Sequence, residues 1–325
     1  MTGTAPAPAT PSPSLLARLR PRWRTRAVVA NLVAQVAIVV TGGAVRLTGS
    51  GLGCSTWPEC EPGQFAPVFH DEMSIHQAVE YGNRTLTGVL VLLAVAVALL
   101  AGRDASRSRR YRVLAWAPLV GVVIQAVVGG ITVLVDLHPA VVGSHFLISM
   151  ALVAVSAWLL VRTREGDGAP RPVVDERLRT LARSLVLLGT VVLVLGVVTT
   201  GAGPHSGDEE VGYRFAVDPY AVARLHALAV WAFLGTLGVV LVLLSRVRRE
   251  ADAARALRSG LVLLGASLAQ GGIGYVQLLT GLPIALVNLH MLGAAVLTAM
   301  LALFHGTLRV RPVAASPEVA GPGRR

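Results

Sequence analysis

The sequence has few charged residues and no lysine. Only 14% of its 325 residues are charged, 54% are hydrophobic, and all 29 basic residues counted as Lys or Arg are arginine. The mean hydropathy is +0.64. Soluble globular domains carry about 25% charged residues, so this composition excludes an ordinary soluble protein.

Long apolar stretches take the place of the missing charge. Eight stretches of about 20 residues are nearly free of charge, which is the length that an α-helix needs to cross the hydrocarbon core of a bilayer. They cover residues 27–48, 80–102, 113–135, 139–161, 184–202, 220–244, 260–281 and 284–307. The sequence therefore predicts an all-α integral membrane protein with eight transmembrane helices.

The arginines are unevenly distributed along the chain. Although the net charge of +11 is typical of nucleic-acid-binding proteins, 25 of the 29 arginines lie in the two tails and in alternate connections between the spans. This distribution follows the positive-inside rule. We therefore expect a multi-pass protein of the cell membrane with both termini in the cytoplasm, contacts to anionic lipid, and no nucleic-acid partner. Residues 1–26 form a basic tail whose beginning is expected to be disordered, and residues 309–325 form a second cytoplasmic tail.

The chain contains a weak internal repeat. Gln125 and His145 are 20 residues apart, and Gln270 and His290 repeat this spacing 145 residues later. Each half has an even number of spans, so both halves enter the membrane from the same side. The repeat is therefore predicted to be parallel, with two four-helix bundles at 27–163 and 181–308, each with its own pocket, joined by a cytoplasmic linker at 164–180.

The sequence has only two cysteines, Cys54 and Cys60, in the motif GCSTWPEC. Both fall in the first outer loop, which faces an oxidising compartment in this topology. We expect a disulfide, structural or redox-active. A metal site or a pair of free thiols is the alternative.

A few polar residues lie inside the spans, where each needs a partner or a function. Glu80, His145, His226 and His290 are all expected near the outer surface. His226 and His290 lie at matching depths in the second half, and small residues follow each of them. Two neutral imidazoles facing each other suit the two axial positions of a haem iron; hydrogen-bonded packing histidines are the alternative.

The first half has His145 but carries Asn83 in the place of a second histidine. His76 lies seven residues before Asn83, and His138 lies seven residues before His145. Seven residues are about two turns if the helix continues. Either is a candidate second ligand or propionate contact, or an ordinary loop histidine. Glu80 shares a helix face with Asn83. It is a candidate acid or base, or a simple ion-pair partner of Arg84, four residues on.

Several motifs together resemble the haem A synthase family. They are TGGAVRLTGSGLGCSTWPEC at the end of the first span, VEYGNRTLTG at the second, and SHFLIS, ARLHALA and VNLHMLGA at the fourth, sixth and eighth. The resemblance implies a haem b held by His226 and His290, and haem O as the substrate with His145 as one ligand. It also implies a catalytic Glu80 and a loop disulfide. The implied reaction oxidises a ring methyl group to a formyl group by successive hydroxylations, with water as the oxygen source.

The resemblance also implies partners. The farnesyltransferase that makes haem O is expected to hand over the substrate, and an electron acceptor, for which a quinone is a candidate, is needed. A homo-oligomer is a further candidate form.

Two departures from the family pattern matter. The better-known members have histidine at the position of Asn83. In this chain the substrate iron is therefore expected to be five-coordinate or bound by His76. Those members can also carry a second cysteine pair, which this chain lacks. The competing interpretations are a membrane di-haem b-type electron-transfer cytochrome, a transporter built from parallel repeats, and a family member that binds haem without oxidising it.

Overall fold

The computed structural model describes residues 15–67, 75–206, 212–247 and 250–312. The predicted disorder at the start of the N-terminal tail and most of the predicted C-terminal tail fall outside these residues. In chain order the described elements are α1 (Leu15–Leu47), α2 (Ile75–Val97), the π-helical segment η1 (Ala98–Gly102), α3 (Arg109–Leu134), α4 (Pro139–Arg164), β1 (Arg171–Pro172), α5 (Glu176–Ala202), α6 (Pro219–Arg246), α7 (Ala251–Leu279), α8 (Ile284–Thr307) and β2 (Arg309–Val310).

The eight helices in the described part of the chain are long and apolar enough to cross a membrane. The prediction of an all-α, multi-pass membrane protein is thereby confirmed. Some helices begin earlier than the apolar stretches suggest: α5 starts at Glu176 rather than at residue 184. Its polar first turn is stabilised by the side chain of Asp175, which accepts a hydrogen bond from the amide of Leu178 at 2.8 Å, as is usual for an N-cap.

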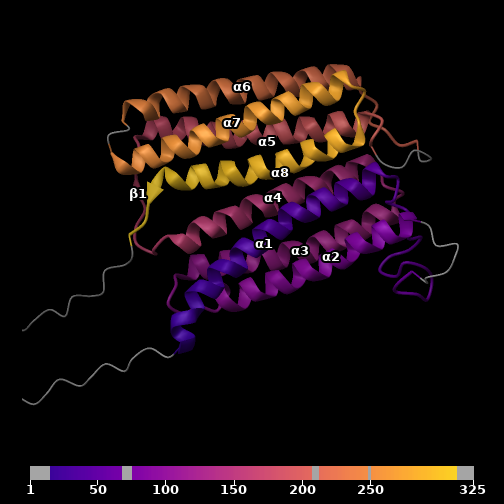
Figure 1. The fold of residues 1–325 in the computed structure, drawn as a ribbon, viewed down its shortest axis with the longest axis horizontal. Coiled ribbons are helices and arrows are strands. Elements are labelled where there is room, and N and C mark those ends of the chain that lie inside the picture. Colours follow the sequence, from indigo (N-terminus) through magenta and orange to yellow (C-terminus); the bar gives the residue numbers. More distant parts are fainter. Residues whose placement is uncertain (1–14, 68–74, 207–211, 248–249, 313–325) are drawn as a thin grey trace, which may run out of the picture.

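The helices lie in two groups along one long axis, α1–α4 on one side and α5–α8 on the other (Figure 1). Within each group every helix packs against its neighbours in a ring, and α8 packs on α1 and α4 between the groups. These contacts accommodate two four-helix bundles, but the parallel repeat itself stays a prediction. Helix α1 begins and α8 ends at the same end of the molecule, here called the terminal end, and the Cys54–Cys60 loop lies at the other, the disulfide end (Figure 1).

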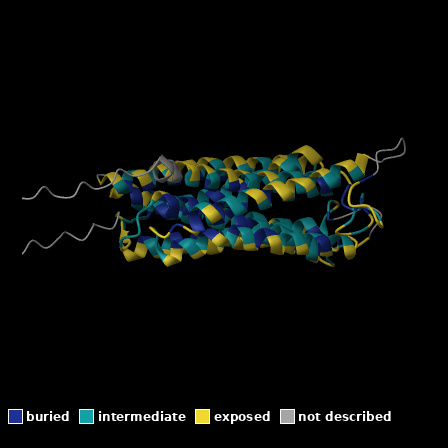
Figure 2. Ribbon diagram, turned by 90° about the horizontal axis from the view of Figure 1, so that it is seen from below, coloured by how far each residue is buried: buried dark blue, intermediate teal, exposed yellow. Residues whose placement is uncertain are grey.

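The outer faces of the helices are exposed (Figure 2) and rich in large apolar side chains. Leu92, Leu187 and Val262 are 71%, 66% and 62% exposed. In water such a surface would be unfavourable, whereas in a bilayer it contacts lipid and the helices satisfy their backbone polar groups internally.

The tightly packed core of the second group lies toward the terminal end, around Leu185, Leu237, Leu263 and Phe304, none of which has exposed surface. Toward the disulfide end the packing is looser. Every residue of the segments 186–200, 223–236 and 268–294 is at least partly exposed. The part of the bundle near the start of α6 and α8 is therefore the part in which a large group is most easily accommodated.

At the terminal end, the linker between α4 and α5 is tied down on both sides. β1 pairs with β2 in an antiparallel arrangement, which fixes the linker to the end of α8. Asp167 accepts hydrogen bonds from Arg107, Ser108 and Arg162. Burial alone would raise the pKa of the Asp167 carboxyl group, but the hydrogen bonds from Arg107 and Ser108 hold this pKa well below its usual range.

Candidate functional site

The structure places Glu80, His145, His226 and His290 at a similar depth. They lie on α2, α4, α6 and α8, all of which begin at the disulfide end. Each residue falls within about two turns of the start of its helix. Four ionisable side chains thus lie in one layer of the bundle.

His226 and His290 face each other in the second group. Their ring centroids are 6.5 Å apart with an interplanar angle of 68°. A bond of about 2 Å from each imidazole nitrogen to a shared metal, plus about 1 Å from nitrogen to ring centre on each side, separates two ring centres by about 6 Å. The observed separation of 6.5 Å is close to this value.

The hydrogen bonding of His226 leaves one ring nitrogen suited to metal binding. Its Nδ1 lies 3.0 Å from the carbonyl oxygen of Val192. Because a carbonyl oxygen only accepts, Nδ1 carries the proton and Nε2 carries the lone pair. A backbone acceptor of this kind commonly fixes the tautomer of a ligating histidine. The Nδ1 of His290 is buried and has no hydrogen-bond partner among the described residues.

A glycine on the preceding helix lies beside each histidine. A Cβ atom added at Gly274 would lie 3.2 Å from Cε1 of His290, and one added at Gly196 would lie 3.3 Å from Cε1 of His226. Gly129 has the same relation to His145, also at 3.3 Å. Larger residues at these positions would compete with the imidazoles for space, so glycine keeps the rings free to take their position.

The first group repeats part of this arrangement. Gln125 donates a hydrogen bond from Nε2 to the carbonyl oxygen of His145 at 3.0 Å, and Gln270 does the same to His290 at 2.7 Å. Gln125 and Gln270, His145 and His290, and Gly129 and Gly274 are each separated by 145 residues. The matched contacts support the predicted repeat, which the sequence indicated only through spacing.

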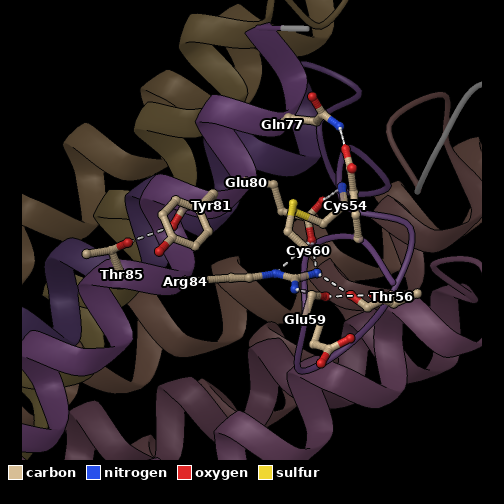
Figure 3. The surroundings of a disulfide bond; sticks show 10 residues. Cys54, Thr56, Glu59, Cys60, Gln77, Glu80, Tyr81, Arg84 and Thr85 are labelled. Carbon is tan, nitrogen blue, oxygen red and sulfur yellow. Dashed lines mark hydrogen bonds and ion pairs between the residues drawn. A yellow bond between two sulfur atoms is a disulfide. The ribbon is translucent and has the colours of Figure 1, made fainter. Parts of the chain in front are cut away.

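Glu80 joins α2 to the loop that carries the two cysteines (Figure 3). Cys54 and Cys60 form a disulfide. One carboxylate oxygen of Glu80 accepts a hydrogen bond from the amide of Cys54 at 2.7 Å. The other accepts from Arg84 at 2.5 and 3.1 Å, so the ion pair considered as an alternative for Glu80 is formed.

Arg84 also binds the backbone of the disulfide loop. Its guanidinium group donates to the carbonyl oxygens of Thr56 and Glu59, each at 3.1 Å (Figure 3). The spacing of Glu80 and Arg84 within one helix gives no signal for these contacts. Arg84 thus fixes both the Glu80 carboxylate and the loop above it.

The remaining candidates of the first group have hydrogen-bond partners in the structure. Oδ1 of Asn83 accepts from the hydroxyl of Thr41 at 2.8 Å. His76 lies on α2, as its predicted two-turn spacing from Asn83 required, and its Nδ1 is 2.9 Å from the hydroxyl of Ser50. His138 is the N-cap of α4, where its Nδ1 accepts from the amide of Ala140 at 3.3 Å. Both histidines thus have a hydrogen-bond partner within the protein, His76 in Ser50 and His138 in the amide of Ala140.

Arg46, in the last turn of α1, contacts the second group. Its Nη2 lies 3.8 Å from the sulfur of Met291, the residue after His290. Its Nε is buried without a hydrogen-bond partner among the described residues. A guanidinium group in this setting is a ready partner for a carboxylate.

No group of three or more His, Cys, Asp or Glu side chains suited to a metal ion occurs in the described part of the chain. A catalytic zinc site needs three such ligands. A haem iron takes four of its bonds from the porphyrin and needs only one or two from the protein. The pair His226 and His290 fits the second requirement.

The fold and the site define a multi-pass membrane protein with a paired-histidine layer near one surface. A family model described as "Cytochrome oxidase assembly protein" matches residues 25–204, more than half of the chain. The chain belongs to this family. The matched region contains Glu80, Asn83, His145 and the two cysteines, and ends before His226.

Individual relatives match over similar lengths. A heme A synthase of Exiguobacterium sibiricum is 32% identical over 167 residues, 51% of this chain and 53% of the relative. A heme A synthase of Exiguobacterium sp. is 30% identical over 166 residues, 51% and 52% of the two chains. One from Bacillus cereus is 29% identical over 177 residues, 53% and 55%. The chain thus matches about half the length of these curated relatives.

Proposed function

We propose that this protein is a haem A synthase, which oxidises a ring methyl group of haem O to a formyl group. The observation that carries the proposal is the layer formed by the facing pair His226 and His290 together with His145 and the loop-bound Glu80. The family membership and the relatives named heme A synthase support it. Successive hydroxylations with water as the oxygen source are the proposed route.

The second group of helices would hold a haem b, which His226 and His290 would bind through their imidazoles. Three observations support the fit: the 6.5 Å separation of the rings, the proton on Nδ1 of His226, and the looser packing around both residues. When bound, such a haem supplies a one-electron relay. Arg46 is suited to bind one of its propionates, because it reaches the start of α8 from the first group.

The first group would hold the substrate, with His145 as a ligand. Glu80 is the candidate base, because oxidation of a methyl group with water releases protons that a positioned carboxylate can accept. Arg84 and the amide of Cys54 orient that carboxylate. Asn83 is not expected to bind iron, because amide side chains are not among the usual haem ligands; its amide oxygen accepts a hydrogen bond from Thr41.

The proposal extends to partners and topology. The farnesyltransferase that produces haem O is the expected donor of the substrate, and a membrane quinone is a candidate electron acceptor. Both termini are proposed to lie in the cytoplasm, because 25 of the 29 arginines fall in the tails and the connections at that end. The disulfide would then face the oxidising side.

The test is to express the full chain in bacterial membranes that make haem O, purify it, and identify the extracted haems by chromatography with mass detection. A haem with the mass and spectrum of haem A, lost in Glu80→Ala, is the expected result. Haem b alone, with no haem A and no hydroxylated product, would overturn the proposal in favour of an electron-transfer cytochrome or an inactive relative.

A further inference from the structure

Two neighbouring cavities lie at the terminal end, opposite the histidine layer. The first has a volume of about 320 Å³. Its lining consists of the basic or imidazole side chains Arg179, Arg183, Arg309 and His305 and of four largely apolar side chains. These are Trp158, Pro170, Pro172 and Leu308. The second, of about 400 Å³, shares Trp158 and Arg309 with the first. The guanidinium group of Arg309 stacks on the ring of Trp158, 4.3 Å from its centroid.

The cavities lie where three helices end and the linker crosses them. Arg179 and Arg183 are near the start of α5, Trp158 is near the end of α4, and His305 is near the end of α8. Pro170 and Pro172 come from the linker that β1 and β2 fasten to α8. Because the spans end here, this region lies at the level of the lipid headgroups.

The charges around the first cavity are unbalanced. No carboxylate among the described residues lines it. Six arginines of the terminal end share only three carboxylates: Arg179 and Arg183 pair with Glu176, Arg309 and Arg311 with Glu165, Arg162 with Glu165 and Asp167, and Arg107 with Asp167. The excess of positive charge favours an anion in the cavity.

We infer that the first cavity binds the phosphate headgroup of an anionic phospholipid, with Arg183 as a principal contact. Three features favour a lipid over free phosphate. The cavity lies at headgroup level, its wall is apolar on one side, and Trp158 belongs to the residues that favour the membrane interface. Basic pockets between helices on the cytoplasmic side are suited to such headgroups. The bound lipid would fasten the linker to α5 and α8.

Arg183 offers a well-matched test. Its side chain is 59% exposed and its ion-pair partner is Glu176, which also binds Arg179. Arg183→Gln is therefore compatible with folding. Arg255 is the control, since it lies at the same end on α7, is 61% exposed, pairs with Asp252, and lines neither cavity. Arg255→Gln changes the net charge equally. Arg183→Lys keeps the charge but loses the planar two-pronged contact.

The measurement is native mass spectrometry of the full chain in detergent, titrated with phosphatidylglycerol, with phosphatidylcholine, or with inorganic phosphate. We expect retention of phosphatidylglycerol over phosphatidylcholine, a loss of about fivefold in affinity in Arg183→Gln, a smaller loss in Arg183→Lys, and no change in Arg255→Gln.

Three outcomes would overturn the inference. Equal losses in Arg183→Gln and Arg255→Gln would show a diffuse attraction to surface charge. Full displacement of the lipid by millimolar phosphate would identify a free-phosphate site. Equal retention of the two lipids would show that the headgroup charge is not recognised. None of these readouts depends on catalytic activity.

Discussion

The buried ion pair between Glu80 and Arg84 allows the structural and the chemical role of Glu80 to be separated. The side chains of Glu80 and Arg84 are 6% and 19% exposed. Arg84→Gln removes both of its bonds to the carboxylate and its bonds to the loop carbonyl oxygens, and leaves Glu80 with the amide of Cys54. Breaking a buried pair in this way costs about 3–5 kcal/mol. Because Arg84 is partly exposed, the expected loss lies at the lower end of this range, about 3 kcal/mol.

Glu80→Gln is expected to be milder for stability. The amide keeps the size of the side chain and one acceptor oxygen, and Arg84 keeps its bonds to the carbonyl oxygens of Thr56 and Glu59. The expected loss is about 1.5–3 kcal/mol, the value of a hydrogen bond to a charged group. The double variant should be more stable than the sum of the single losses predicts, because neither charge is then left buried alone.

Activity should follow a different order. If Glu80 accepts protons during the reaction, Glu80→Gln and the double variant both lose haem A formation by about a hundredfold or more, although they remain folded. Arg84→Gln, which keeps the carboxylate, should retain more activity than Glu80→Gln despite its lower stability. Thermal unfolding in detergent gives the order of the variants in stability, and haem A formation in membranes gives their order in activity. A Glu80→Gln variant with wild-type activity, or activity that falls in step with stability across all three variants, would refute a chemical role.

Four further changes test other parts of the molecule. His290→Ala should remove the low-spin spectrum of a bis-histidine haem, whereas His145→Ala should leave it unchanged; the same loss in both variants would contradict the assignment to the second group. Arg46→Gln should weaken haem binding by about tenfold in a titration of the haem-free protein, since one charged contact to a propionate is lost, and unchanged affinity would exclude that contact. Asn83→His should increase the retention of the substrate haem during purification by adding a second imidazole opposite His145; unchanged retention would show that position 83 does not face the iron. The pKa of Asp167 is lowered in the folded state, so its contribution to stability is present above about pH 4 and is lost on acidification below it. The gap in unfolding temperature between wild type and Asp167→Asn should therefore narrow as the pH falls below about 4, and a constant gap would contradict the linkage.

The fold was largely predictable because the bilayer imposes a simple length rule. A span needs about 20 apolar residues, and the eight predicted stretches correspond to the eight helices of the described chain. The beginnings of α5 and α7 were less predictable. Their first turns are polar and lie beyond the apolar stretch, so their boundaries depend on capping and on tertiary contacts such as that of Asp175 with Leu178.

The candidate site was predictable in its residue types and less so in its contacts. Glu80, His145, His226 and His290 were identifiable because polar groups within apolar spans are conspicuous. The bonds of Arg84 to the disulfide loop, and that of Asn83 to Thr41 on α1, were not identifiable. They join segments whose relative rotation and height are set by packing, and no spacing within one helix reports on them.

The differences between the two halves assign them different tasks within the proposed reaction. Both halves share the bond from glutamine to the histidine backbone and the glycine beside the imidazole, so each can present one imidazole from its fourth helix. On the facing helix the second half has His226, with its proton fixed by Val192, while the first half has Asn83, bonded to Thr41. Two protein ligands hold an iron more firmly than one, which suits a resident electron relay. A single ligand leaves a group easier to exchange, which suits a substrate that must enter and leave, and in this half a carboxylate, Glu80, lies in the same layer as the histidine.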